Sequence, residues 1–199
     1  MNRLALALLV FALAGCGSGK SSDEQPATTN PGSPPPMATT STNADCSLKG
    51  ATEAPQVSSS DQRPDEAMYL TDVSFAAVDC ASAVVFDLEP KAQVPGYRVS
   101  YEPASTAKVE DASGRPVEIE GEAFLVVKLD PAMTARIDGD QVTKTYTGPR
   151  RLHGSGPITE VVKTGDFEGV VTWVIGLDRA RPFLATGSAG QLFVDIESS

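Results

Sequence analysis

The sequence predicts an all-β fold, an antiparallel β-sandwich, and three observations lead to it. Apolar and polar residues alternate in six short windows between residues 69 and 196, which is the spacing of half-buried strands. Turns that contain Gly or Pro separate the windows, as at Glu89-Pro90 and Pro95-Gly96. No window of convincing length shows the period of an amphipathic helix, so sheet packing must supply the core.

Each window predicts one strand, because alternate residues of a strand point to the same face of a sheet. In the first half, the residues expected to share a face are Tyr69, Thr71, Val73 and Phe75, then Val84, Phe86 and Leu88, then Tyr97, Val99 and Tyr101. In the second half they are Leu125, Val127 and Leu129, then Val171, Trp173 and Ile175, then Leu192, Val194 and Ile196. The pattern also allows a helix of one or two turns from Pro131 to Ile137 and a further strand from Ile158 to Lys163.

An export signal is predicted at the start of the chain. Arg3 precedes an apolar run from Leu4 to Ala14, which is too short for a membrane-spanning helix of about 20 residues. The run ends in Leu-Ala-Gly-Cys, which resembles the lipobox of bacterial lipoproteins, in which the cysteine is diacylated and becomes the first residue after cleavage. The resemblance implies lipidation of Cys16, and two acyl chains hold a protein stably at a membrane. The alternative is a plain secretory signal with an incidental cysteine.

The composition after Cys16 predicts a tether before the folded domain. Residues 17–45 consist mainly of Ser, Thr, Pro, Gly and Asn, and such a segment buries too little apolar surface to fold. We therefore expect three parts: a lipoprotein signal peptide over 1–15, the lipidated cysteine and a disordered tether over 16–66, and the β-sandwich over 67–199.

The charge and cysteine content narrow the partners and the compartment. The chain has 26 Asp and Glu against 16 Lys and Arg, which disfavours nucleic acid and anionic lipid head groups as partners. The membrane contact should therefore be the lipid on Cys16. Outside the cytoplasm, Cys46 and Cys80 can form a disulfide that closes a loop of about 35 residues. Two free thiols or an intermolecular bridge are the alternatives.

The sequence offers little to a catalytic or metal-binding interpretation. His153 is the single histidine, and the chain has no Gly-x-Ser-x-Gly, His-Glu-x-x-His or Cys-x-x-Cys motif. The acidic pairs Glu118 with Glu120 and Asp138 with Asp140 are expected to be solvated rather than to form an acid–base pair. We therefore predict no enzyme activity, no cofactor and no metal.

Two arginine-rich loops are the candidate ligand-binding positions. Each adjoins a strand that carries an aromatic residue, and a guanidinium group can hold a carboxylate with two hydrogen bonds or stack on a ring. The candidate set for an anionic or sugar-peptide ligand is Arg150, Arg151, Trp173, Asp178, Arg179 and Arg181. The alternative is that these arginines pair with Asp166, Glu168 and Asp178 and only fix the geometry of the loops.

Several blocks in order resemble the AMIN-like domain of actinobacterial lipoproteins. They are Val94–Val99 with its Pro95-Gly96 turn, Tyr146–Arg151, Thr164–Gly169, Trp173–Arg179 and Arg181–Phe183, within a region from Tyr69 to Glu197. AMIN domains proper accompany periplasmic N-acetylmuramoyl-L-alanine amidases and pilus secretins and are β-sandwiches associated with localisation and peptidoglycan binding. The resemblance implies a non-catalytic binding module for peptidoglycan or a cell-wall partner protein, lipid-anchored outside the cytoplasm. A wall-polymer hydrolase, or a small-molecule or lipid carrier that uses the sandwich interior, are the alternatives.

Overall fold

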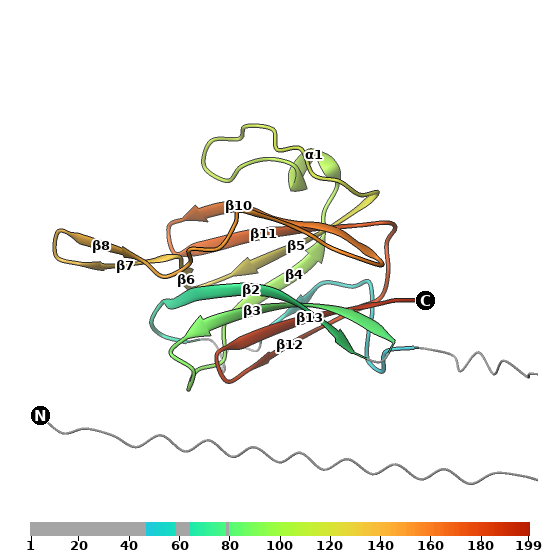
Figure 1. The fold of residues 1–199 in the computed structure, drawn as a ribbon, viewed down its shortest axis with the longest axis horizontal. Coiled ribbons are helices and arrows are strands. Elements are labelled where there is room, and N and C mark those ends of the chain that lie inside the picture. Colours follow the sequence, from blue (N-terminus) through green and yellow to red (C-terminus); the bar gives the residue numbers. More distant parts are fainter. Residues whose placement is uncertain (1–46, 59–63, 79) are drawn as a thin grey trace, which may run out of the picture. The chain divides into compact units, whose positions relative to one another are not determined.

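Two sheets packed face to face form the domain in the computed structural model, which describes residues 47–58, 64–78 and 80–199 (Figure 1). The first sheet has six strands in the order β1 (Gln56–Val57), β4 (Tyr97–Tyr101), β5 (Ala123–Leu129), β11 (Val170–Leu177), β10 (Ile158–Phe167) and β9 (Arg151–His153). The second has five in the order β12 (Phe183–Ser188), β13 (Gln191–Glu197), β3 (Ala81–Glu89), β2 (Met68–Val78) and β6 (Ala132–Met133). Strand β2 pairs parallel with β6, and the other described pairs are antiparallel. The predicted antiparallel β-sandwich is confirmed.

The core lies between the sheets and is built from alternate residues of both. The predicted faces of β3, β5, β11 and β13 all point into it and are fully or almost fully buried. Trp173 lies at the centre, with its ring edge-to-face against Phe86 at 6.1 Å and Tyr146 at 5.5 Å between centroids. Each such aromatic side chain buries a large apolar area, so this cluster contributes strongly to the stability of the domain.

The prediction of which β2 residues face the core is wrong for part of the strand. A β-bulge shifts the register of the β2–β3 pair between Leu70 and Asp72. The buried residues are therefore Met68, Leu70 and Val73, whereas Phe75 is 40% exposed. An extra residue in one strand moves everything beyond it to the other face, and strict alternation cannot anticipate that shift.

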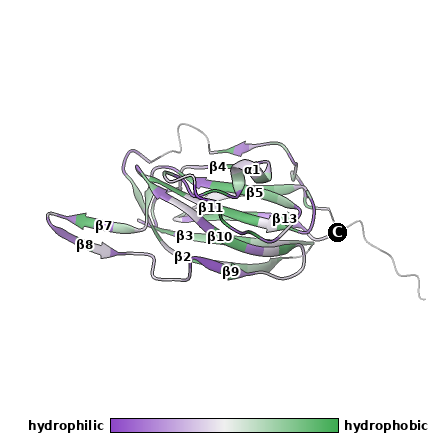
Figure 2. Ribbon diagram, turned by 90° about the horizontal axis from the view of Figure 1, so that it is seen from above, coloured by the Kyte–Doolittle hydropathy of each residue, from purple (hydrophilic) through white to green (hydrophobic). Residues whose placement is uncertain are grey.

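The pattern allowed a short helix from Pro131 to Ile137, but the structure has parts of two strands in this segment instead. Its first residues form β6, and Met68 donates its amide hydrogen to the Pro131 carbonyl oxygen at 3.0 Å. It continues into the hairpin of β7 (Ala135–Asp138) and β8 (Gln141–Lys144), which projects beyond the sheets in Figure 2. Pairing with β2 and within the hairpin satisfies this backbone better than one isolated helical turn would.

The one helix among the described residues is the four-residue α1 (Ala104–Ala107), which covers the outer face of the six-stranded sheet (Figure 1). A second apolar cluster fills the space beneath this part of the chain: Ala107, Ile119, Phe124, Val126, Val162 and Val174. No helix in the described ranges has the length and apolar content to cross a membrane.

The domain was predicted to begin at Ala67, but residues before that position also belong to the fold. Strand β1 pairs with β4, and Thr52 bridges to Phe183 of β12. The predicted signal peptide, Cys16 and residues 17–46 lie outside the described residues. Cys80 is not a free thiol, but Cys46 also lies outside, so the pairing of the two stays a prediction.

Candidate functional site

Arg151 binds a buried carboxylate of its own chain. Glu160, on the neighbouring strand β10, has a side chain with 0% exposure and forms an ion pair with the Arg151 guanidinium. Arg151 also donates to the Glu118 carbonyl oxygen at 2.6 Å, and Glu160 accepts the amide hydrogen of Glu120. The pair therefore joins β9 and β10 to the segment that precedes β5.

Arg150 holds a different loop. It donates to Glu110 at 2.8 Å and to the Lys163 carbonyl oxygen at 2.8 Å. Arg115 and Ser113 also donate to Glu110, and the Arg150 hydrogen bond is the largest of the effects that lower the pKa of this carboxyl to about 2. About half of the Arg150 side chain stays exposed, so this ion pair is a surface contact.

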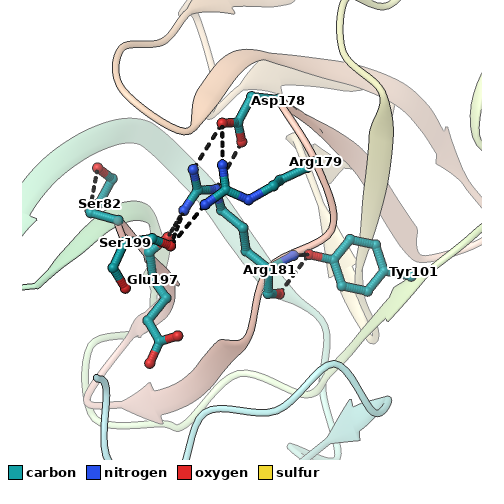
Figure 3. A network of polar contacts seen from close by, with 8 residues as sticks. Ser82, Tyr101, Asp178, Arg179, Arg181, Glu197 and Ser199 are labelled. Atoms are coloured by element: carbon teal, nitrogen blue, oxygen red, sulfur yellow. Dashed lines mark hydrogen bonds and ion pairs between the residues drawn. The ribbon is translucent and has the colours of Figure 1, made fainter. Parts of the chain in front are cut away.

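The second arginine loop holds the last residues of the chain (Figure 3). Arg181 is 6% exposed and donates two hydrogen bonds of 2.8 Å to Asp178, which lower the pKa of that carboxyl. Its Nη1 also donates to the carbonyl oxygens of Glu197 at 3.0 Å and Ser199 at 2.6 Å. Its backbone exchanges two hydrogen bonds with the Tyr101 hydroxyl. Arg181 is thus fully engaged within the fold.

The structure does not bring the six predicted ligand-binding residues to one surface. Trp173 is completely buried in the core, so its proposed contact with a ligand is wrong. Arg151 and Arg181 bind carboxylates of the fold. Of the predicted partners, Asp178 pairs with Arg179 and Arg181, whereas Asp166 contacts Lys163 and Thr134 instead. Arg150 and Arg179 keep the most exposed guanidinium groups of the set.

The residues considered for catalysis lie apart on the surface. His153 is exposed on β9, and its side chain has no hydrogen bond or ion pair with another described residue. The acidic residues Glu118, Glu120, Asp138 and Asp140 are exposed as well. The described ranges contain no group of three side chains that could hold a metal ion.

A surface cleft of about 720 Å³ lies at the base of the β7–β8 hairpin. Its lining comes from four separate segments: Glu66, Ala67 and Tyr69; Glu89, Pro90, Lys91 and Gln93; Met133; and Arg136. Arg136 stacks on the Tyr69 ring at 4.5 Å and pairs with Glu89 at 2.7 Å. Gln93 Oε1 is buried and accepts no hydrogen bond. A buried acceptor in a cleft suits a ligand that offers an N–H or O–H group.

Sequence reasoning missed this cleft because its residues are scattered. The Pro95-Gly96 turn, part of the resemblance above, was the nearest signal. The loop before that turn is held in place because Gly190 donates to the Gln93 carbonyl oxygen at 2.6 Å. This hydrogen bond fixes the backbone of Gln93, whose side chain lines the cleft.

Of the three comparisons with known proteins, one gives a match. No curated protein and no solved structure gives a match to the chain. The family model of the AMIN-like domain matches residues 68–198, which include the whole of the region from Tyr69 to Glu197 in which the resemblance was seen. These residues comprise both sheets apart from β1, the hairpin, and the cleft at its base apart from Glu66 and Ala67. The chain therefore belongs to the AMIN-like domain family.

Proposed function

We propose that this protein is a non-catalytic binding module of the cell envelope that contacts peptidoglycan and is held at the membrane by a lipid on Cys16. The observation that carries the proposal is the family match over residues 68–198, because AMIN-like domains occur in extracytoplasmic envelope proteins. The lipobox-like motif supports the anchor, and the polar segment after it supplies the length of chain between the anchor and the domain.

The cleft at the hairpin base is the surface that we assign to the wall polymer. The hydroxyl and acetamido groups of its sugars offer the O–H and N–H donors that Gln93 Oε1 lacks. Arg136 and Glu89 neutralise each other beside it, so the cleft favours an uncharged sugar over an ion. The space between the sheets is filled by large side chains such as Trp173 and Phe86, which argues against a carrier that uses the interior.

Co-sedimentation with purified cell wall tests the proposal. The probe is the mature chain, residues 16–199, with Cys16→Ser so that no lipid is attached. We expect retention at low salt, and at least a several-fold loss with Gln93→Ala. Gln141→Ala is the matched control, because Gln141 is exposed on the hairpin and its side chain has no partner among the described residues. Absence of retention at low salt would refute the peptidoglycan proposal.

The anchor and the disulfide are tested separately. In cells, Cys16→Ser should move the full chain from the membrane fraction to the soluble fraction, and the lipidated N-terminal peptide should carry the mass of the acyl chains. The Cys46–Cys80 bridge should appear as one cross-linked peptide in a non-reducing digest of the mature chain. A soluble wild-type chain, or two separate thiol peptides, would contradict the respective proposal.

A further inference from the structure

Four residues form a row across the outer face of the six-stranded sheet. Val57 of β1 is the register partner of Arg98 in β4, Arg98 is opposite Lys128 in β5, and Lys128 is opposite Thr172 in β11. The flanking Val99 and Val127 point into the core, so Arg98 and Lys128 point outward. We refer to Val57, Arg98, Lys128 and Thr172 as the cross-strand row.

The two cations of the row are not explained by the fold. Like charges directly opposite each other on neighbouring strands repel, which destabilises the pair. Neither Arg98 nor Lys128 forms an ion pair or a side-chain hydrogen bond with another described residue. Eight other cations in the described ranges do pair with a carboxylate: Lys91, Arg115, Arg136, Arg150, Arg151, Lys163, Arg179 and Arg181. Lys49, Lys108 and Lys144 also lack a carboxylate partner among the described residues, but Arg98 and Lys128 differ from them in facing each other directly across two strands, in a chain with ten more acidic than basic residues.

The row lines two adjoining depressions. Arg98 and Lys128 line a groove of about 410 Å³ together with Val57, Ser58, Tyr97, Asp130 and Val170. Among the described residues that line this groove, Asp130 is the one carboxylate, and it is itself engaged in an interaction. Lys128 also lines a smaller cavity of about 160 Å³ beside α1, together with Thr172 and the carboxylates Glu102 and Asp111.

Thr172 supplies a second, independent sign of a ligand. Its residue is 2% exposed, and its Oγ1 atom is buried without a hydrogen-bond partner. Buried polar groups are normally paired, so an unpaired hydroxyl in a cavity indicates a missing partner. A threonine hydroxyl can accept a hydrogen bond from an amide or donate one to a carbonyl.

We propose that the cross-strand row binds the carboxylate of a short wall peptide, an inference that rests on the proposed peptidoglycan binding. The carboxylate lies between Arg98 and Lys128, where it neutralises both cations. The peptide amide reaches Thr172, and a small aliphatic side chain such as that of alanine packs on Val57, which is 57% exposed. The aliphatic and hydroxyl groups favour a peptide over a phosphate polymer, for which the two cations alone would suffice.

Titration with a minimal probe tests the row. N-acetyl-L-Ala-D-Glu is added to the ¹⁵N-labelled mature chain with Cys16→Ser, and backbone NMR shifts are followed at low salt. We expect shifts at β4, β5 and β11 and weak binding that Arg98→Gln or Lys128→Gln reduces at least tenfold. Thr172→Val should reduce it several-fold. Lys144→Gln is the control, because Lys144 is also exposed and unpaired among the described residues but lies on the hairpin.

The comparison probes separate carboxylate recognition from simple charge attraction. The diamide of the same dipeptide should not bind, and glycerol phosphate should bind at least tenfold more weakly than the dicarboxylate. Equal binding of the diamide, stronger binding of the phosphate, or unchanged affinity in Lys128→Gln would each overturn the proposal. Removing one cation also removes the repulsion, so both Gln variants should unfold at an equal or higher denaturant midpoint. A lower midpoint would show that the cations serve the fold and would overturn the proposal.

The wall assay keeps this proposal distinct from the proposed function. If the Arg98→Gln, Lys128→Gln double variant is still retained on the wall and the wild type does not bind the dipeptide, only the proposal for the cross-strand row is refuted. Dipeptide binding without wall retention refutes the proposal that the module binds the wall. The assignment of the carboxylate to a wall peptide is then refuted as well, because it rests on wall binding.

Discussion

Replacing Arg151 by alanine should unfold the domain more easily rather than abolish a binding site. The Glu160 carboxylate would stay buried at 0% exposure with one backbone amide as its remaining donor. Removing one partner of a buried ion pair costs about 3 to 5 kcal/mol. The Arg151 side chain is 37% exposed, so water can replace part of the contact and we expect the lower end, about 3 kcal/mol. For a domain of this size that is a fall in Tm of roughly 10 °C.

The assay is urea unfolding followed by the fluorescence of Trp173, the single tryptophan of the chain and fully buried. Arg150→Ala is the matched control, because Arg150 is about half exposed and its partner Glu110 is not completely buried, and it should produce less than about a third of the effect. Adding Glu160→Gln to Arg151→Ala should recover part of the loss, since no buried charge then remains. If Arg151→Ala behaves like Arg150→Ala, Glu160 does not need its partner and the structural assignment of Arg151 is wrong.

Three further predictions concern the loops and one strand. Arg181→Lys keeps the charge but loses the two-pronged contact with Asp178, so stability in urea should fall by about 2 kcal/mol; an unchanged midpoint would contradict this. The pKa of Glu110 lies at about 2, below its ordinary 4.5. Its contribution to stability is therefore full above pH 4.5 and lost as the pH falls toward 2, and Glu110→Gln should flatten the acid unfolding curve over that range. A Cβ atom at Gly176 would lie 1.9 Å from a backbone carbonyl oxygen, so Gly176→Ala should cost at least about 2 kcal/mol; wild-type stability of this variant would show that the facing loop yields.

The strands could be predicted because burial imposes its period directly on the sequence. Val84, Phe86 and Leu88 alternate with more polar residues since one face of β3 lies against the core. The bulge in β2 left no such mark, because a register shift depends on the partner strand and not on local composition. The Pro131–Ile137 segment was misjudged for a related reason: β2 and the hairpin, not its own residues, determine its structure.

The candidate site was less accessible to prediction, because ion pairs depend on which residues the fold brings together. The sequence showed two arginine loops, but Glu160 and Glu110 were not visible as their partners. Arg98 and Lys128 are the opposite case, because the sequence does not mark them although they lack a partner among the described residues of the fold. Thirty residues separate them in the chain, and only the register of β4 against β5 places the two charges side by side. Neighbouring arginines in the sequence therefore led to cations that stabilise the fold. The unpaired cations Arg98 and Lys128 are not marked by any local sequence pattern.

The two candidate surfaces lie on either side of one short segment. Asp130 lines the groove of the cross-strand row and Met133 lines the cleft at the hairpin base. These two positions are three residues apart in the chain, so their Cα atoms lie at most about 10 Å apart, a distance comparable to one repeat of a polymer that joins sugars to peptides. A ligand with both a sugar and a peptide part would bind more tightly than either part alone. Once one part is bound, the other part is held at a high local concentration near the second surface.

This arrangement predicts a specific pattern of independence and coupling. Gln93→Ala should leave the affinity for the dipeptide probe unchanged, because that probe contacts only the row. Lys128→Gln should likewise leave the binding of N-acetylglucosamine unchanged. Retention on intact wall should fall with either variant, and in the double variant by no less than the product of the two losses. If each variant affects both small probes, the surfaces form one site; if the wall responds to only one variant, the other surface does not contact the polymer.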